Sequence, residues 1–390
     1  MAVTLNQRNA PPGRTVSTVE GEPRGRSPFL AELAGQPALG HIGPNWYASV
    51  MGTGIVANAA TTLPVHVPGL LIFAAAVWVA ASLLLIAVTA ATALHWLRHR
   101  DTARNHLDHP VMSHFYGAPA MALMTVGAGA VLVGQPLIGA QAAIGVDAVL
   151  WTAGTALGLW TAVVVPYKLF TSHDVKADSA FGGWLMPVVP PMVSAATGTL
   201  LLPHLPAGQA QLTLQLACYA MFGLSLIASL VIITLIWSRL AQHKVGAAAA
   251  VPTLFIVLGP LGQSITATHN LGVTAPTVLP APYGTAFNAL GLVYGLPVWG
   301  FAMLWLTLAA AITVRTLRQH LPFSLTWWSF TFPVGTVVTG TSGLAAATGA
   351  HVLAIAAVAL YAGLLLAWGV VATRTARGVW SGQLLRTPIS

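Results

Sequence analysis

Residues 69–97 read GLLIFAAAVWVAASLLLIAVTAATALHWL, without a single Asp, Glu, Lys or Arg. A helix of this length, at about 1.5 Å per residue, exceeds the roughly 30 Å of hydrocarbon in a bilayer. Its apolar side chains fall on every face, whereas a membrane β-strand would be short and would alternate apolar with polar residues. Arg98 and Arg100 follow at once. The stretch therefore predicts a transmembrane helix that ends at a basic, water-facing boundary.

Similar runs recur to the end of the chain, which has 390 residues, 56% of them hydrophobic and 6% charged. Soluble domains carry about 25% charged residues, so this composition excludes a soluble fold. We therefore predict an all-α membrane protein with ten transmembrane helices. The apolar runs cover residues 44–63, 69–97, 111–134, 143–166, 182–203, 211–238, 249–270, 284–314, 323–346 and 350–373.

Positive charge follows a strict order along the chain. All 16 Lys and Arg lie in the N-terminal tail or after an even-numbered run, and the loops after the odd-numbered runs hold none. Lys and Arg stay on the cytoplasmic side of a membrane, so both termini are expected in the cytoplasm of a multi-pass plasma-membrane protein. The net charge of +8 is then explained by topology and by attraction to anionic lipid heads, and it predicts no nucleic-acid partner.

The chain divides into three parts on composition. Residues 1–40 are rich in Pro, Gly, Arg and Ser and lack the apolar core of a secretory signal, so a disordered cytoplasmic tail is expected. Residues 41–375 form the expected membrane domain, and residues 376–390 a cytoplasmic C-terminal tail. The only cysteine, Cys218, lies inside an apolar run, which excludes an intrachain disulfide.

The odd-numbered runs begin near residues 44, 111, 182, 249 and 323, so the chain reads as five helical hairpins. Odd runs are rich in Gly, Pro, Ser and Thr, and most carry a proline that is expected to bend the helix in its middle. Backbone freed at a bend must be buried or face a wet cavity. We therefore predict a pseudo-fivefold arrangement, with the odd helices around a central pore and the even helices toward lipid and neighbouring subunits. The bend or pore residues are Gly52, Gly54, Pro119, Pro190, Pro191, Pro260 and Pro333.

No side chain that must be ionised is expected deep in the membrane. Asp147 is the nearest, and it is expected in the first turn of the fourth helix at the outer face. This pattern argues against a charged binding pocket and against a proton-driven carrier. A pore lined by Ser, Thr, small residues and the exposed amides of bent helices would instead hold anions weakly. No nucleophile–base pair, cofactor or metal site is predicted, so the protein is not expected to be an enzyme.

Two features are candidates for the pore itself. Phe332 precedes Pro333 and is the only large aromatic beside a bend proline, so it either plugs the pore or packs in the core. Gln263, Thr266 and Asn270 share one face of the seventh helix. These three side chains either line the pore or hydrogen-bond between helices.

Each histidine within an apolar run is either a packing residue or a ligand. His114 and His269 are more typical of hydrogen-bonded packing residues than of ligands, although His114 is included among the pore candidates. His95 and His99 have the i, i+4 spacing of a metal pair. They lie at a basic helix end without an accompanying carboxylate, so a metal site is not predicted there.

Three stretches resemble the tellurite-resistance/dicarboxylate transporter family: PNWYASVMGTG at 44–54, HPVMSHFYGAPAMAL at 109–123 and FSLTWWSFTFP at 323–333. The family includes bacterial tellurite-resistance proteins, a yeast malate permease and sulfite pump, and plant slow-type anion channels. The resemblance implies ten helices in five hairpins around a central anion pore, in a homotrimer with one pore per protomer. It also implies an occluding Phe on the ninth helix, a role that falls on Phe332, with Phe330 as its neighbouring candidate.

These observations predict membrane transport of small anions. The candidates are C4-dicarboxylates such as malate, sulfite, chloride, nitrate and oxyanions such as tellurite. The alternatives are a proton-coupled carrier of another fold, which would need Asp147, and an intramembrane enzyme. The sequence leaves open the identity of the anion and the choice between channel and coupled carrier.

Overall fold

The computed structural model describes residues 29–33 and 35–386, and this part of the chain contains helices and no strand. Seven of its helices are long and apolar enough to cross a membrane. The predicted class, an all-α membrane protein, is confirmed. Seven is fewer than the ten runs predicted because α1 (Tyr47–Thr62) has 16 residues and α11 (Phe332–Thr348) has 17. The remaining segment, residues 182–204, is divided into short helices.

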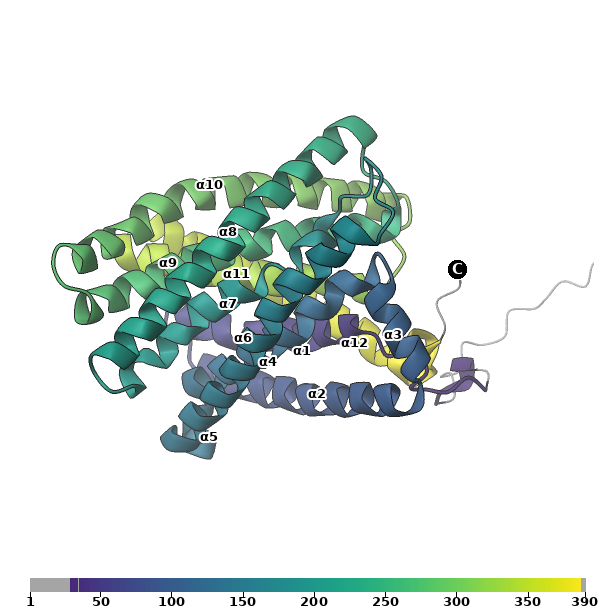
Figure 1. Cartoon of the computed structure of the whole chain (residues 1–390), viewed down its shortest axis with the longest axis horizontal. Helices are drawn as coiled ribbons and strands as arrows, with labels where there is room; N and C mark the ends of the chain where they lie inside the picture. Colours follow the sequence, from purple (N-terminus) through teal and green to yellow (C-terminus); the bar gives the residue numbers. More distant parts are fainter. Residues whose placement is uncertain (1–28, 34, 387–390) are drawn as a thin grey trace, which may run out of the picture.

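Five long, continuous helices alternate with five composite segments. The C-terminal ends of the long helices lie on the same side of the molecule, at the right of Figure 1. The Lys and Arg residues of the described part of the chain gather there, as the charge order predicts. The long helices are α2 (Leu70–Arg98), α6 (Ala140–Thr171), α8 (Gln209–His243), α10 (Tyr283–Arg318) and α12 (His351–Ser381).

Each composite segment begins as a 3₁₀-helix and continues as an α-helix. The first is η2 (Pro44–Trp46) with α1, and the last is η9 (Leu325–Phe330) with α11. The second adds a π-helical turn, η4 (Ala130–Gly134), before α5 (Gln135–Ile138). The other composite elements are η3 (Met112–Tyr116), α4 (Gly117–Gly129), η5 (Gly182–Leu185), α7 (Pro190–Thr197), η6 (Gly198–Leu200), η7 (Leu202–His204), η8 (Ala248–Val257) and α9 (Leu258–Val278).

The prolines stand in the first turn of the α-helices, so the prediction of mid-helix bends is wrong. Pro190 and Pro191 are the first two residues of α7, and Pro333 is the second residue of α11. Pro119 and Pro260 occupy the first turns of α4 and α9. Proline is tolerated there because the first amides of an α-helix have no partner within it.

Backbone amides near these junctions are bonded rather than exposed. The amide of Met192 donates to the carbonyl oxygen of Val189 at 2.8 Å, and the amide of Gly335 donates to that of Thr331 at 2.9 Å. Val189 lies in the turn between η5 and α7, and Thr331 directly follows η9, so the residue before each α-helix supplies the acceptor. The expected lining of free amides is therefore not found at these two junctions.

The composite segments form the interior. Helix α1 contacts α4, α4 contacts α7, α7 contacts α9, α9 contacts α11, and α11 returns to α1. In the most apolar window of Ala248–Val278, 83% of the residues are buried, and 61% in that of Met112–Ile138. The corresponding windows of the five long helices are 22–28% buried. The long helices therefore form the outer layer of the molecule.

Within the described residues, packed structure extends into both segments that were predicted to be tails, so each tail is shorter than predicted. The amide of Leu30 donates to the carbonyl oxygen of Trp380 at 2.8 Å, and the Phe29 ring lies 5.1 Å from the Trp380 ring. Helix α12 continues to Ser381, beyond the predicted boundary at residue 375. Residues 29–33 therefore pack on the end of α12. The rest of the predicted N-terminal tail, residues 1–28, lies outside the described residues. Two short helices, η1 (Ala31–Leu33) and η10 (Gln383–Leu385), complete this end.

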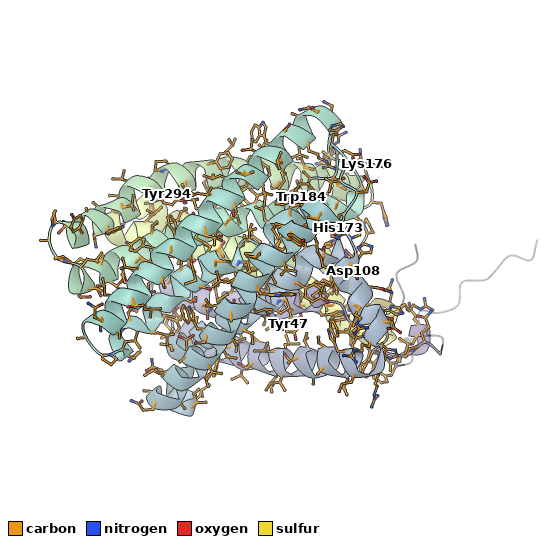
Figure 2. All side chains as sticks on the ribbon, in the orientation of Figure 1. Tyr47, Asp108, His173, Lys176, Trp184 and Tyr294 are labelled. Carbon is orange, nitrogen blue, oxygen red and sulfur yellow. The ribbon has the colours of Figure 1, made fainter. Side chains whose placement is uncertain are left out.

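An ion pair and a hydrogen bond connect the loops at the basic end. Asp108, at the end of α3 (Arg100–Asp108), forms an ion pair with Lys168 of α6. The carbonyl oxygen of Asp108 also lies 3.1 Å from the Nε2 atom of His173. Figure 2 shows Asp108, His173 and Lys176 on this side of the molecule and Tyr294 on the other.

Glycines let the inner segments approach backbone to backbone. A Cβ atom on Gly117 would overlap the carbonyl oxygen of Met186, and one on Gly182 would overlap that of Thr253. Both contacts join neighbouring composite segments at the start of an α-helix or 3₁₀-helix. Only glycine allows this spacing.

We expect Gly117→Ala to lower the melting temperature of the detergent-solubilised protein by several degrees, because the new methyl group must displace a backbone carbonyl. Gly300→Ala in α10 is the control, since a Cβ atom there meets nothing within 4 Å. Alanine at such a position favours a helix by about 1 kcal/mol. Equal melting temperatures for the two variants would contradict the close packing of α4 on η5.

Candidate functional site

All five composite segments meet at a small inner cavity of about 20 Å³. Phe332 is 3% exposed and lines this cavity. Almost every other side chain around it is apolar, and methionines recur among them. Each segment contributes to the lining, with Met51, Met121, Val189, Gly259 and Phe332 among the residues.

A larger outer cavity of about 440 Å³ lies farther along the same five segments, away from the basic end. Among the described residues that line it, none is Asp, Glu, Lys or Arg, and His269 provides an imidazole. The cavity is therefore polar without a fixed charge. Hydroxyl and amide groups line it, including those of Asn58, Thr199, Gln263, Thr266, Asn270 and Thr339.

The predicted polar face of the seventh run lies in this outer cavity. Thr266 and Thr339 share a hydrogen bond of 2.7 Å, and the Asn270 amide donates to the carbonyl oxygen of Ala196 at 3.2 Å. Gln263 is 5% exposed and also lines the cavity. These side chains therefore line a cavity, and two of them also form hydrogen bonds between segments.

Phe332 and Phe330 face opposite directions. Phe330 packs against Phe255, with ring centroids 4.9 Å apart, and lines an apolar groove between α10 and α12 on the outside of the molecule. Phe330 is the last residue of η9 and Phe332 the first of α11, so the junction between the two helices separates the rings. Of the two candidates for the occluding aromatic, only Phe332 reaches the inner cavity.

Residues 41–376 match the family described as voltage-dependent anion channel. The chain belongs to this family. It is 30% identical to the sulfite efflux pump of Trichophyton rubrum over 311 residues, which cover 78% of this chain and 82% of that protein. The match to the sulfite efflux pump of Arthroderma benhamiae has the same identity and coverage. An uncharacterized transporter of Methanocaldococcus jannaschii is 28% identical over 346 residues, 88% of this chain and 95% of that protein. The predicted resemblance is confirmed.

Three other residues that were predicted to line the pore pack against neighbouring segments and line neither cavity. They are Gly52, Gly54 and His114. A Cβ atom on Gly52 would overlap the Thr331 hydroxyl, and one on Gly54 would lie 2.8 Å from a methyl group of Thr125. His114 is buried, with its ring stacked 6.1 Å from that of Trp184. These residues let α1 and η3 pack closely on their neighbours.

Sequence reasoning missed several lining residues. Asn58 interrupts an apolar stretch of α1, and its amide donates to the carbonyl oxygen of Thr125 at 3.0 Å. The methionines Met121 and Met186 line the inner cavity. A buried amide within a run is a signal that could have been used, whereas methionine is common in any apolar core.

Asp147 lies deeper than predicted. Helix α6 begins at Ala140, so Asp147 is two turns into the helix rather than in its first turn. It is fully buried against Gly127 of α4, and neither carboxyl oxygen has a hydrogen-bond partner among the described residues. It lines neither the inner nor the outer cavity.

His95 and His99, the two histidines with i, i+4 spacing, belong to a stack of histidine rings at the basic end. The His95 ring lies 5.9 Å from that of His99 and 5.4 Å from that of His106, and its Nδ1 atom lies 2.8 Å from the carbonyl oxygen of Leu39. No group of three or more His, Cys, Asp or Glu within the described ranges could hold a metal ion. Burial, reinforced by His95, His41 and His109, lowers the pKa of His106 to about 4.

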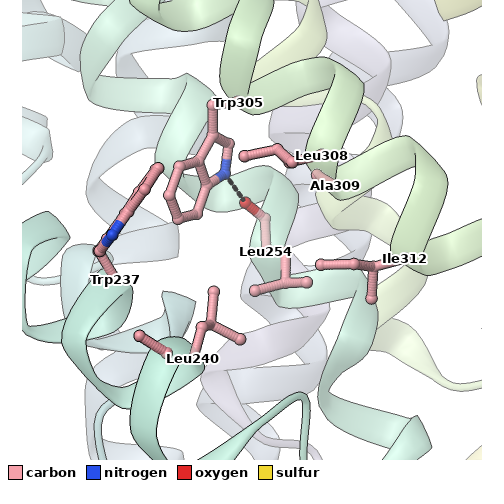
Figure 3. Close-up of a pocket in the computed structure, with 8 residues that line it drawn as sticks. Trp237, Leu240, Leu254, Trp305, Leu308, Ala309 and Ile312 are labelled. Atoms are coloured by element: carbon pink, nitrogen blue, oxygen red, sulfur yellow. Dashed lines mark hydrogen bonds between the residues drawn. The ribbon is translucent and has the colours of Figure 1, made fainter.

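A separate apolar pocket of about 270 Å³ opens on the outer surface between α8 and α10. Figure 3 shows the Trp305 indole donating a hydrogen bond to the carbonyl oxygen of Leu254, at 2.8 Å, beside Trp237. Only one of the five composite segments contributes to the lining of this pocket, and it does so with residues of η8. It is therefore a feature of the outer layer and no part of the two central cavities.

The outer cavity can be tested by cysteine labelling, because the native Cys218 is buried. We expect Thr266→Cys to react with a charged, water-soluble maleimide added to the detergent-solubilised protein. Ser264→Cys is the matched control, since Ser264 is fully buried and accepts a hydrogen bond from Tyr294 at 2.8 Å. Equal labelling of both variants, or no labelling of Thr266→Cys, would contradict the assignment.

We expect stability to fall on acidification from about pH 6.5 to about pH 4 because of His106. Over this range the unfolded imidazole binds a proton, while the folded one, with its pKa lowered to about 4, stays neutral. The measurement is the melting temperature in detergent across these pH values. His106→Gln should reduce the slope, and the exposed His66→Gln should not. A slope unchanged in His106→Gln would overturn this expectation.

Proposed function

We propose that this protein conducts small anions across the membrane between its five composite segments, with Phe332 closing the path. One observation carries the proposal. The same five segments line both central cavities, and the apolar inner cavity lies between the polar outer cavity and the basic end. Membership of the voltage-dependent anion channel family agrees with this assignment.

Ten membrane crossings are part of the proposal. A 3₁₀-helix rises about 2.0 Å per residue, so η2 and α1 together reach roughly 30 Å, the thickness of the hydrocarbon core. The cycle of contacts among the composite segments supports a pseudo-fivefold arrangement. The single basic end supports cytoplasmic termini in the plasma membrane. The family resemblance favours a homotrimer with one path in each protomer.

The substrate we favour is sulfite or bisulfite. A neutral polar cavity binds a small anion weakly through hydroxyl and amide dipoles, which permits rapid release. The named activity of the fungal relatives, sulfite efflux, favours this oxyanion. Chloride, nitrate and tellurite satisfy the same requirements of charge and size. A dicarboxylate such as malate fits less well, because no Lys or Arg lines the outer cavity to pair with its second carboxylate.

Two alternatives have less support. A proton-coupled carrier would have to route protons through Asp147, which lines neither cavity. An enzyme is disfavoured because the named relatives are transporters and pumps. We propose a passive path with a side-chain gate.

We expect Phe332→Ala to increase anion flux several-fold, because removing the ring enlarges the inner cavity. Flux through proteoliposomes or current across planar bilayers would be compared for chloride, nitrate, sulfite and malate. Phe330→Ala is the matched control, since this ring lies outside the path. Truncation of a buried Phe costs about 3–5 kcal/mol in a packed core, so retention of the fold is checked by the melting temperature.

Unchanged flux through a folded Phe332→Ala would exclude Phe332 as the gate. Uptake that requires a proton gradient, with no current from either variant, would instead indicate a coupled carrier.

A further inference from the structure

The outer face of α12 changes from apolar to basic along a single stripe. Gly363, Ala367 and Val370 line the groove between α10 and α12. Arg374 and Arg377 continue the same face at i+4 and i+7 from Val370. These two arginines are exposed and line the adjoining pocket at the basic end.

The groove is an apolar channel of about 690 Å³ on the outer layer. Small residues on both helices, such as Ala310 and Gly363, deepen it, and its floor is formed by Phe330 and Val334 from the η9–α11 segment. Thr313 is the only polar residue in its lining. Within a bilayer, a depression of this kind accommodates a hydrocarbon chain.

The basic pocket joins the groove at Trp327. The Arg374 guanidinium lies 4.8 Å from the centroid of the Trp327 ring, and this ring also lines the groove. Among the described residues the only salt bridge is between Lys168 and Asp108, so neither Arg374 nor Arg377 has a carboxylate partner there. Ser381 and Gln383 add polar groups to the pocket. Two such arginines at a membrane boundary favour a phosphate.

We propose that the face between α10 and α12 binds an anionic phospholipid, with its phosphate at Arg374 and Arg377 and an acyl chain in the groove. The basic pocket lies beyond the end of the apolar groove. The two features therefore follow each other in the same order as the phosphate and the acyl chain of a phospholipid. A second copy of the chain is a poorer occupant. The whole sequence offers 8 Asp and Glu against 16 Lys and Arg, so a neighbour has few carboxylates for the pocket.

The bound chain would lie directly behind the inner cavity. It would touch Phe330 and Val334, while Phe332 between them faces the opposite side. Lipid occupancy therefore supports the position of the Phe332 ring. This consequence rests on the proposed gate, whereas lipid binding itself does not.

Native mass spectrometry would measure the retention of phosphatidylglycerol relative to phosphatidylcholine by the full chain. We expect the double variant Arg374→Gln/Arg377→Gln to lose most of the preference for phosphatidylglycerol. Arg98→Gln/Arg100→Gln, at the end of α2 and the start of α3, is the control, because it removes the same charge from exposed residues outside the groove and pocket. Retention of the preference in the first variant would overturn the headgroup site.

The acyl-chain site is tested by filling the groove. Ala367→Trp should reduce the retention of both lipids, and Ala362→Trp, on an exposed part of α12 outside the groove, should not. No effect of Ala367→Trp would overturn the assignment of the chain. Competition by glycerol phosphate as effective as that by phosphatidylglycerol would indicate a phosphate site without a lipid.

A photo-crosslinking residue, benzoylphenylalanine, in place of Val370 tests the competing occupant, because it labels any surface that lies on the groove, including the different surface that a neighbour in a trimer presents. Efficient crosslinking between copies in native membranes would place a second protomer on the groove and overturn the lipid proposal. Absence of this crosslink, together with retained phosphatidylglycerol, supports it. These readouts measure binding and crosslinking, so they remain informative if Phe332→Ala leaves anion flux unchanged.

Discussion

Backbone-to-backbone contact between the inner segments is the constraint on which the rest of the structure depends. Gly117 and Gly182 lie against carbonyl oxygens of neighbouring segments, and a Cβ atom on Gly340 would be 2.9 Å from the carbonyl oxygen of Gly262. Small residues permit such approach in membranes, where helix association relies on close packing rather than on water exclusion. The segments leave only about 20 Å³ between them at the inner cavity. The Phe332 ring forms part of the wall of this small space.

The change from 3₁₀-helix to α-helix orients the groups around this constriction. Proline stands in the first turn of four of the inner α-helices, where its missing amide costs no helical hydrogen bond. Around Pro333 the change also separates two aromatic rings. Phe332 faces the inner cavity, and Phe330 faces the groove between the outer helices. One short segment thus connects the centre of the molecule with its lipid-facing surface.

Charged side chains and uncharged polar side chains lie in different parts of the structure. Among the residues that the structure describes, Arg and Lys gather at one end, where water and lipid headgroups stabilise them. The outer cavity relies on hydroxyl and amide groups, because an ionised side chain is costly inside a membrane. Dipoles attract an anion less strongly than a fixed cation does, which is the physical basis of the rapid release that we propose. Selection then depends on the size of the path and the field within it.

The sequence by itself determined the membrane class, the basic end and the family, because length, composition and charge order need no tertiary contact. It also predicted that the Gly- and Pro-rich runs lie inside, in agreement with the greater burial of Ala248–Val278. Only the tertiary structure decided which face each residue presents. It separated Phe332 from Phe330, moved the prolines to helix starts and placed Asp147 two turns into α6. Lipid and protein core are both apolar, so a hydrophobic run has little periodicity to mark its inner side, and packing alone chooses it.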